Sequence, residues 1–183
     1  MRTKKISTLG TAAAGLVISL VGVTSAHAAA QTILVPNDFN PARSDTRTGG
    51  SYTVEGTGLR ITTQSNTSLD KVAEYVDTNK PLSSVGEPTL DYTPISGTIP
   101  PGFQLVVDFD GDGTDDGILI GEPQFYGNVW WLNNSADADV KARAPMNPGS
   151  SGSAFGYDGT LDEWRAAFPA AVVKAFGFSL GSG

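Results

Sequence analysis

The chain has 183 residues, no cysteine, one histidine and a formal net charge of −7 at pH 7. The absence of cysteine excludes disulfide and thiol chemistry, and the acidic balance argues against nucleic acid, which needs clustered Lys and Arg. The histidine is His27. The rest of the chain therefore has no imidazole for Ser-His-Asp catalysis or for zinc and copper sites.

Residues 1–30 have the pattern of a secretory signal peptide. A basic start is followed by an apolar stretch, Thr11–Val23, and then by small residues that offer Ala26-His27-Ala28 or Ala28-Ala29-Ala30 as a cleavage box. The apolar stretch is shorter than the roughly 20 residues of a membrane span. We therefore expect a secreted, extracellular protein with no membrane insertion.

Cleavage of this segment makes the chain more acidic. The loss of Arg2, Lys4 and Lys5 reduces 12 basic residues to nine, while all 19 acidic residues remain, so the net charge becomes −10. Residues 31–183 are enough for one domain with a core of its own. An acidic exterior suits a soluble extracellular protein that binds cations.

Short apolar runs between Gly and Pro turn signals predict a mostly β fold, a single β-sandwich or jelly-roll-like domain. Asn37–Gly50 and Asn133–Gly159 are predicted to be loops, and the length of the second indicates a loop that is either functional or poorly ordered. In the last strand we expect Val173 and Ala175 on the same face. The expected strands are Thr32–Val35, Tyr52–Val54, Leu59–Thr63, Lys71–Val76, Gln104–Asp108, Gly117–Gly121, Val129–Leu132 and Val172–Leu180, the last an interior strand.

One short helix is expected near the C-terminus. Thr160-Leu161-Asp162-Glu163 has the spacing of a capping box, in which Thr160 and Glu163 satisfy each other's backbone N–H groups. Leu161, Trp164 and Phe168 follow at helical spacing and form an apolar stripe. Trp164 is therefore predicted to belong to the core, and Pro169 to end the helix.

The most specific chemical signal is the run Asp108-Phe109-Asp110-Gly111-Asp112-Gly113-Thr114-Asp115-Asp116-Gly117. Its carboxylates would repel one another without a cation, and calcium takes six to eight such oxygen ligands. Apolar β-type segments flank the run, and Leu119 stands where an EF-hand would have glutamate, so a calcium hairpin is expected instead of a helix–loop–helix. The predicted ligands are Asp108, Asp110, Asp112, Asp116 and the backbone carbonyl of Thr114, with Asp115 pointing away or supporting them. The alternative is a solvated acidic turn.

This hairpin resembles the calcium loops of FG-GAP repeats in integrin-type propellers, which share the D-x-D-G-D-G-x-x-D run followed by an apolar strand. One copy is present, so a propeller is not implied.

Further motifs occur in a fixed order along residues 31–183, with the acidic hairpin among them. They are Asp45-Thr46-Arg47, Gly58-Leu59-Arg60, Asp70-Lys71-Val72-Ala73, the acidic hairpin, Gly121-Glu122-Pro123, Tyr126–Leu132, Gly159–Trp164 and Gly177–Gly183. Their combination resembles a group of uncharacterised secreted proteins and C-terminal modules from actinobacteria, whose members usually continue past the final Gly-Ser-Gly with another strand. The resemblance implies no activity, and it leaves open a truncated C-terminus or an unpaired sheet edge.

Four residues that follow the acidic run form a candidate site for a polysaccharide or another cell-surface partner. They are Glu122, Tyr126, Trp130 and Trp131. Aromatic rings stack on sugars, but adjacent strand residues face opposite ways, so at most one tryptophan is expected to be exposed. The alternative, which we favour, is that both tryptophans serve structure alone. Glu122 is expected either to bind a ligand or to pair with Arg143 or Lys141.

Three functions compete. We favour a secreted, non-catalytic, calcium-binding module for glycans or a cell surface over a structural extracellular protein without a small-molecule ligand. A carboxylate-dependent polysaccharide-active enzyme comes third, because its candidate glutamates show no catalytic spacing. Ser179 lies in a G-x-S-x-G match without the helix and histidine of a nucleophile elbow. The candidate glutamates are Glu55, Glu74, Glu87, Glu122 and Glu163.

Overall fold

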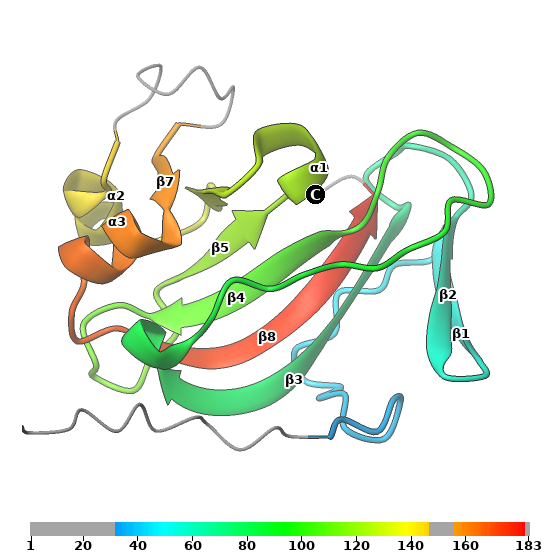
Figure 1. Cartoon of the computed structure of the whole chain (residues 1–183), viewed down its shortest axis with the longest axis horizontal. Coiled ribbons are helices and arrows are strands. Elements are labelled where there is room, and N and C mark those ends of the chain that lie inside the picture. Colours follow the sequence, from blue (N-terminus) through cyan, green and yellow to red (C-terminus); the bar gives the residue numbers. More distant parts are fainter. Residues whose placement is uncertain (1–31, 147–155, 182–183) are drawn as a thin grey trace, which may run out of the picture. The chain divides into compact units, whose positions relative to one another are not determined.

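The computed structural model describes residues 32–146 and 156–181, and residues 33–183 cluster as one compact unit. The proposed signal peptide, residues 1–30, lies outside the described residues. In chain order (Figure 1) the elements are β1 Gly50–Glu55, β2 Gly58–Thr63, β3 Lys71–Pro81, the 3-10 turn η1 Leu82–Ser84, β4 Gly102–Asp108, β5 Gly117–Gly121, α1 Pro123–Tyr126, β6 Val129–Leu132, α2 Ala138–Arg143, β7 Asp158–Thr160, α3 Leu161–Ala167 and β8 Val172–Gly181.

The strands form two antiparallel sheets. Six of them make the main sheet in the order β3-β8-β4-β5-β6-β7, and β1 pairs with β2 in a separate hairpin. The prediction of a mostly β, sandwich-like domain is confirmed, with the second sheet reduced to two strands. Strand β8 lies between β3 and β4, as expected of an interior strand (Figure 1). None of the helices in the described ranges has the length and apolar character of a membrane span.

The main sheet has apolar side chains on both faces. Along β4, Leu105 and Val107 enter the larger core, whereas Val106 enters a smaller cluster on the other face. The predicted facing of β8 is wrong at Val173. An irregularity in the β4–β8 register places Val173 in the larger core and Ala175 in the smaller cluster. A bulge of this kind adds a residue to one strand and so reverses the alternation.

Helix α3 closes the larger core. Its capping box is confirmed: the Thr160 hydroxyl accepts from the backbone N–H of Glu163, and the Glu163 carboxylate accepts from the N–H of Thr160 at 2.8 Å. Trp164 is fully buried, stacks on Phe168, and donates its indole N–H to the carbonyl of Trp130 at 3.0 Å. The helix is therefore attached to the sheet by packing and by one buried hydrogen bond.

Two predictions about the chain's irregular parts are wrong. Thr32–Val35 is not a strand; the Asp38 N–H donates to the Leu34 carbonyl in a turn, and the Leu34 side chain is largely exposed. The predicted loop Asn133–Gly159 contains helix α2 and the first residues of β7. Val140 anchors α2 in the core, and β7 exists through its pairing with β6. Residues 147–155 of that loop lie outside the described residues.

The segment before β1 lies along the outer edge of β3. Three of its backbone N–H groups donate to β3 carbonyls: Asn40 to Tyr75, Asp45 to Ala73 and Arg47 to Lys71, at 2.8, 3.0 and 2.8 Å. These bonds cover an edge that would otherwise offer unpaired groups to another chain. They also fix this segment against the main sheet.

Candidate metal centre

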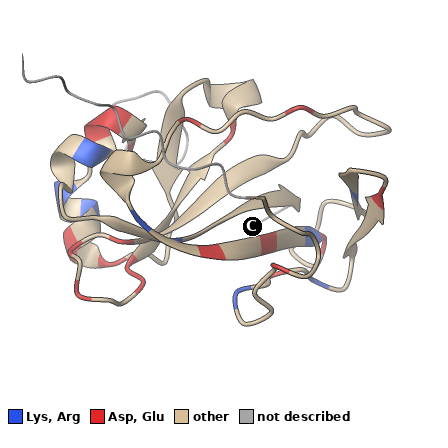
Figure 2. Ribbon diagram, turned by 60° about the horizontal axis from the view of Figure 1, so that its bottom comes forward, with Lys and Arg blue, Asp and Glu red and all other residues tan. Residues whose placement is uncertain are grey.

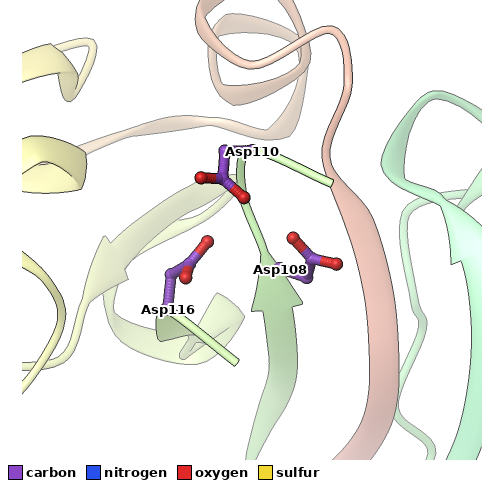
Figure 3. A group of neighbouring side chains, drawn as sticks. All are labelled: Asp108, Asp110 and Asp116. Atoms are coloured by element: carbon purple, nitrogen blue, oxygen red, sulfur yellow. The ribbon is translucent and has the colours of Figure 1, made fainter. Parts of the chain in front are cut away.

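Three aspartates converge in the loop that joins β4 to β5. Asp108 is the last residue of β4, Asp110 lies in the turn, and Asp116 immediately precedes β5. One carboxylate oxygen from each lies within 4.8 Å of the others, and the three side chains face a common space (Figure 3). Asp108 is buried, Asp116 is partly buried and Asp110 is exposed. This arrangement opens the cluster to solvent on one side.

Glycines with positive φ shape the turn. Gly111 and Gly113 have φ values of 83° and 102°, in the region that residues with a Cβ rarely adopt. Their N–H groups point back and donate to the two carboxylate oxygens of Asp108, at 2.7 and 2.9 Å. The backbone thus compensates for the burial of the Asp108 charge and fixes the direction of its side chain.

Asp116 is held in a less favourable environment. Its carboxylate accepts from the N–H of Phe109 at 2.6 Å, and its own N–H donates to the Val107 carbonyl at 2.9 Å. Burial raises the pKa of Asp116, and the charges of Asp110 and Asp108 raise it further. The folded protein therefore holds this carboxylate where a negative charge is disfavoured unless a cation is near.

The other two predicted ligands lie outside this cluster. The Asp112 carboxylate accepts from both the N–H and the hydroxyl of Thr114, at 2.8 and 2.6 Å, and these bonds lower the pKa of Asp112. Both residues are exposed. The Asp115 carboxylate lies against Arg43. The residue that the sequence did not reveal is Arg43, because nothing in the local run points to a partner so far upstream.

The cluster has the chemistry of a hard-cation site. It offers carboxylate oxygens alone, with no nitrogen or sulfur donor, as calcium and magnesium prefer. Asp108, Asp110 and Asp116 would hold such an ion, and the open side leaves room for water or for carbonyl ligands. Acidic residues are also spread over other parts of the ribbon (Figure 2). The loop differs from those parts because its carboxylates converge, and not merely because it is acidic.

The residues predicted to bind a polysaccharide or a cell-surface partner differ in their exposure to solvent. Trp130 is buried with 3% of its surface exposed, whereas Trp131 is partly exposed, as the alternation along β6 predicted. The Trp131 indole N–H donates to the Glu122 carboxylate at 3.3 Å. Tyr126, in α1, is partly exposed.

The ion pairs expected for Glu122 are wrong. The Arg143 guanidinium donates to the Ala167 carbonyl and lies over the Phe168 ring, and Lys141 donates to the Asn134 carbonyl. Both basic side chains therefore donate to backbone carbonyls near the helices, and neither pairs with Glu122.

The glutamates considered for catalysis each have a separate partner. Glu163 caps α3, and Glu74 is buried and accepts from the hydroxyls of Ser44 and Thr46. Glu55 lies 3.5 Å from Arg60, and Glu87 lies 3.7 Å from Arg165. Ser179 lies within strand β8 and accepts from the Gln104 amide. Glu163 and Glu74 therefore have structural roles, whereas the pairs of Glu55 and Glu87 lie at the surface.

The comparisons with known proteins address the same region. Residues 105–135 match the model of the FG-GAP repeat, a span that contains most of β4, the acidic loop, β5 and β6. FG-GAP repeats are β-rich units that are typically extracellular and commonly bind calcium. The similarity to FG-GAP loops predicted from the sequence is thus confirmed for this segment. No curated protein and no solved structure matches the chain.

Proposed function

We propose that this protein is a secreted, calcium-binding β module without catalytic activity. The observation that carries the proposal is the convergence of Asp108, Asp110 and Asp116 in a glycine-shaped turn, within a segment that matches the FG-GAP repeat. Calcium fits because it tolerates irregular oxygen geometry and accepts water among its ligands. Asp112 and the Thr114 carbonyl remain candidate ligands if the turn closes further around the ion.

The electrostatics of the loop support this proposal. Repulsion among the three carboxylates opposes folding, and a bound divalent cation replaces it with attraction. An ion that binds only the folded state stabilises it by mass action, by about 2.7 kcal/mol at a hundredfold excess over Kd. The ion would therefore act on stability even where it has no further role.

The experiment is thermal unfolding in millimolar calcium and in chelator. We expect a higher Tm with calcium in the wild type, and no calcium response in Asp110→Asn. The matched control is Asp91→Asn, which removes the same charge from an exposed loop and should respond like the wild type. Identical wild-type curves in calcium and chelator would refute the proposal.

The export pattern of residues 1–30 supports secretion, and the extracellular character of FG-GAP repeats agrees with it. We further propose that the partner is a polysaccharide or another cell-surface component, bound beside Trp131, Tyr126 and Glu122. The supporting observation is the partly exposed Trp131 ring, whose indole N–H is bonded to Glu122. Trp130 would contribute only by supporting the strand.

A glycan array with the calcium-loaded protein tests this second step. Binding should be lost in Trp131→Ala and retained in Phe125→Ala, which removes an exposed ring from the neighbouring helix α1. Equal binding by both variants, or none by the wild type, would favour a structural extracellular protein without a small-molecule ligand.

A further inference from the structure

The Arg43 side chain joins the acidic loop to the edge of the main sheet. It lies 72 positions before Asp115 in the chain. Its Nη1 is 2.6 Å and its Nη2 3.5 Å from the two Asp115 carboxylate oxygens, while its Nε is 2.8 Å from Oδ1 of Asp77 on β3. The guanidinium therefore forks between two carboxylates on separate elements, a geometry that arginine alone among the basic residues provides.

The position of Arg43 is set independently of the loop. The backbone N–H of Arg43 donates to the Asn40 carbonyl at 3.0 Å, and the backbone N–H of Ala42 donates to the Asn40 side-chain oxygen at 2.9 Å. Together these bonds make a compact turn. The Asn40 amide also donates to the second oxygen of Asp77 at 2.7 Å. Because Asn40 is itself bonded to Tyr75 on β3, the sheet determines where the guanidinium lies.

The side chains of Asp115 and Asp116, which are neighbours in the sequence, point to different partners. Asp116 already pairs with β4 through its N–H, and its carboxylate belongs to the aspartate cluster, whereas the Asp115 carboxylate meets Arg43. Asp116 continues the pairing of β5 with β4, and in such paired backbone consecutive side chains leave on opposite sides. A twist that brought Asp115 inward would therefore carry Asp116 out of the cluster.

We infer that Arg43 is a positioning residue for the acidic loop: by holding Asp115 outward, it keeps the Asp116 carboxylate among the groups that bind the cation. This inference rests on the calcium function proposed above and adds a residue from outside the segment that matches the FG-GAP repeat. Groups that orient metal ligands from outside the coordination sphere affect metal affinity by about 10–100-fold.

Whether the removal of Arg43 strengthens or weakens calcium binding distinguishes a positioning role from the effect of its charge. Arg43 is a positive charge near a cation site, so its removal alone should strengthen calcium binding by Coulomb's law. Loss of positioning should weaken it. The pair is partly exposed, with side-chain exposures of 23% for Arg43 and 40% for Asp115, so it adds little to stability. A change in affinity would consequently not be a by-product of unfolding.

Calorimetric titration with calcium chloride tests the inference on folded, full-length mature protein. Arg43→Gln should weaken binding about tenfold. The control is Arg60→Gln, which removes the same charge from an exposed pair on the β1–β2 hairpin and should bind as the wild type does. The combined variant Arg43→Gln/Asp115→Asn leaves the net charge unchanged and should also bind about tenfold more weakly.

The outcomes are distinct. Wild-type affinity or tighter binding in Arg43→Gln, with a calcium-binding wild type, would overturn the positioning role and leave the proposed function intact. A wild type that does not bind calcium would overturn both. If Arg43→Gln fails to fold, the charge-balanced double variant decides the question, and wild-type affinity in that variant would overturn the inference.

Discussion

Phe109 joins the core around Trp164 to the acidic β4–β5 loop, and the two regions differ in what holds them together. Phe109 is 2% exposed and its ring centroid lies 5.7 Å from that of Trp164 and 4.7 Å from that of Phe168. Its neighbours in the sequence, Asp108 and Asp110, belong to the aspartate cluster. The core is held by apolar packing and by the buried bond from the Trp164 indole N–H to the Trp130 carbonyl, whereas the loop holds charges that repel.

This difference shows how the fold imposes the loop's geometry. Because Phe109 is fixed in the core, Asp108 and Asp110 cannot separate freely to relieve their repulsion. The contribution of the core to the free energy of unfolding should then not depend on calcium, whereas the contribution of the loop should. Variants on either side of Phe109 can break or sharpen that distinction.

The largest effect is expected in the core. Trp164→Ala should lower the free energy of unfolding by about 3–5 kcal/mol, because it leaves a cavity beside Phe109 and Phe168 and removes the bond to the Trp130 carbonyl. Urea denaturation in chelator measures this loss. The calcium-dependent increment in stability should remain, provided that the variant folds.

The matched control is Trp131→Ala, which removes the same side chain from a partly exposed position and should cost less, about 1–2 kcal/mol. A loss below about 1 kcal/mol in Trp164→Ala would contradict the assignment of this residue to the core.

A smaller effect is expected at the junction of β7 and α3. Thr160→Ala removes the side chain that accepts from the Glu163 N–H, and the loss of such a cap costs about 1 kcal/mol. Urea denaturation again measures the change, with Thr89→Ala in an exposed loop as the control. No difference between the two variants would show that the capping box is dispensable here.

A further effect, on the pH dependence of stability, concerns Asp70, another buried carboxylate, whose charge the protein itself compensates. Hydrogen bonds from Ser65 and Thr67 lower the pKa of Asp70 from 3.8 to about 2. A carboxyl group with a lowered pKa contributes stability above its unfolded pKa and loses it as pH falls through its folded pKa. The wild type should therefore lose this contribution between about pH 4 and pH 2.

Urea midpoints from pH 5 to pH 2.5 test the role of Asp70. The pH dependence should be shallower in Asp70→Asn than in the wild type, while Asp91→Asn, at an exposed position, should follow the wild type. Parallel curves for the wild type and Asp70→Asn would contradict the assigned cause. Asp116 shows the contrast: burial and the charges of Asp110 and Asp108 raise its pKa, although the Phe109 N–H donates to it.

Local patterns predicted the parts of the fold whose determinants are close in sequence. The capping box at Thr160 and the apolar stripe that includes Trp164 are contained in one helix, and the alternation along β6 separated Trp130 from Trp131. The aspartate run could be identified because its glycines and carboxylates lie within a single turn.

The parts that the sequence did not reveal depend on distant partners. Strand β7 has three residues and exists through pairing with β6, and α2 is fixed by Val140 in the core. The facing of Val173 follows from a bulge against β4, which no pattern within β8 encodes. Arg43 reaches Asp115 only because the segment that carries it lies along β3.

Anomalous diffraction from crystals grown with calcium tests the central claim most directly. We expect one calcium peak, at about 2.3–2.6 Å from carboxylate oxygens of Asp108, Asp110 and Asp116. Absence of that peak in crystals grown with excess calcium, with the three side chains turned apart, would contradict the assignment of this loop as a calcium site.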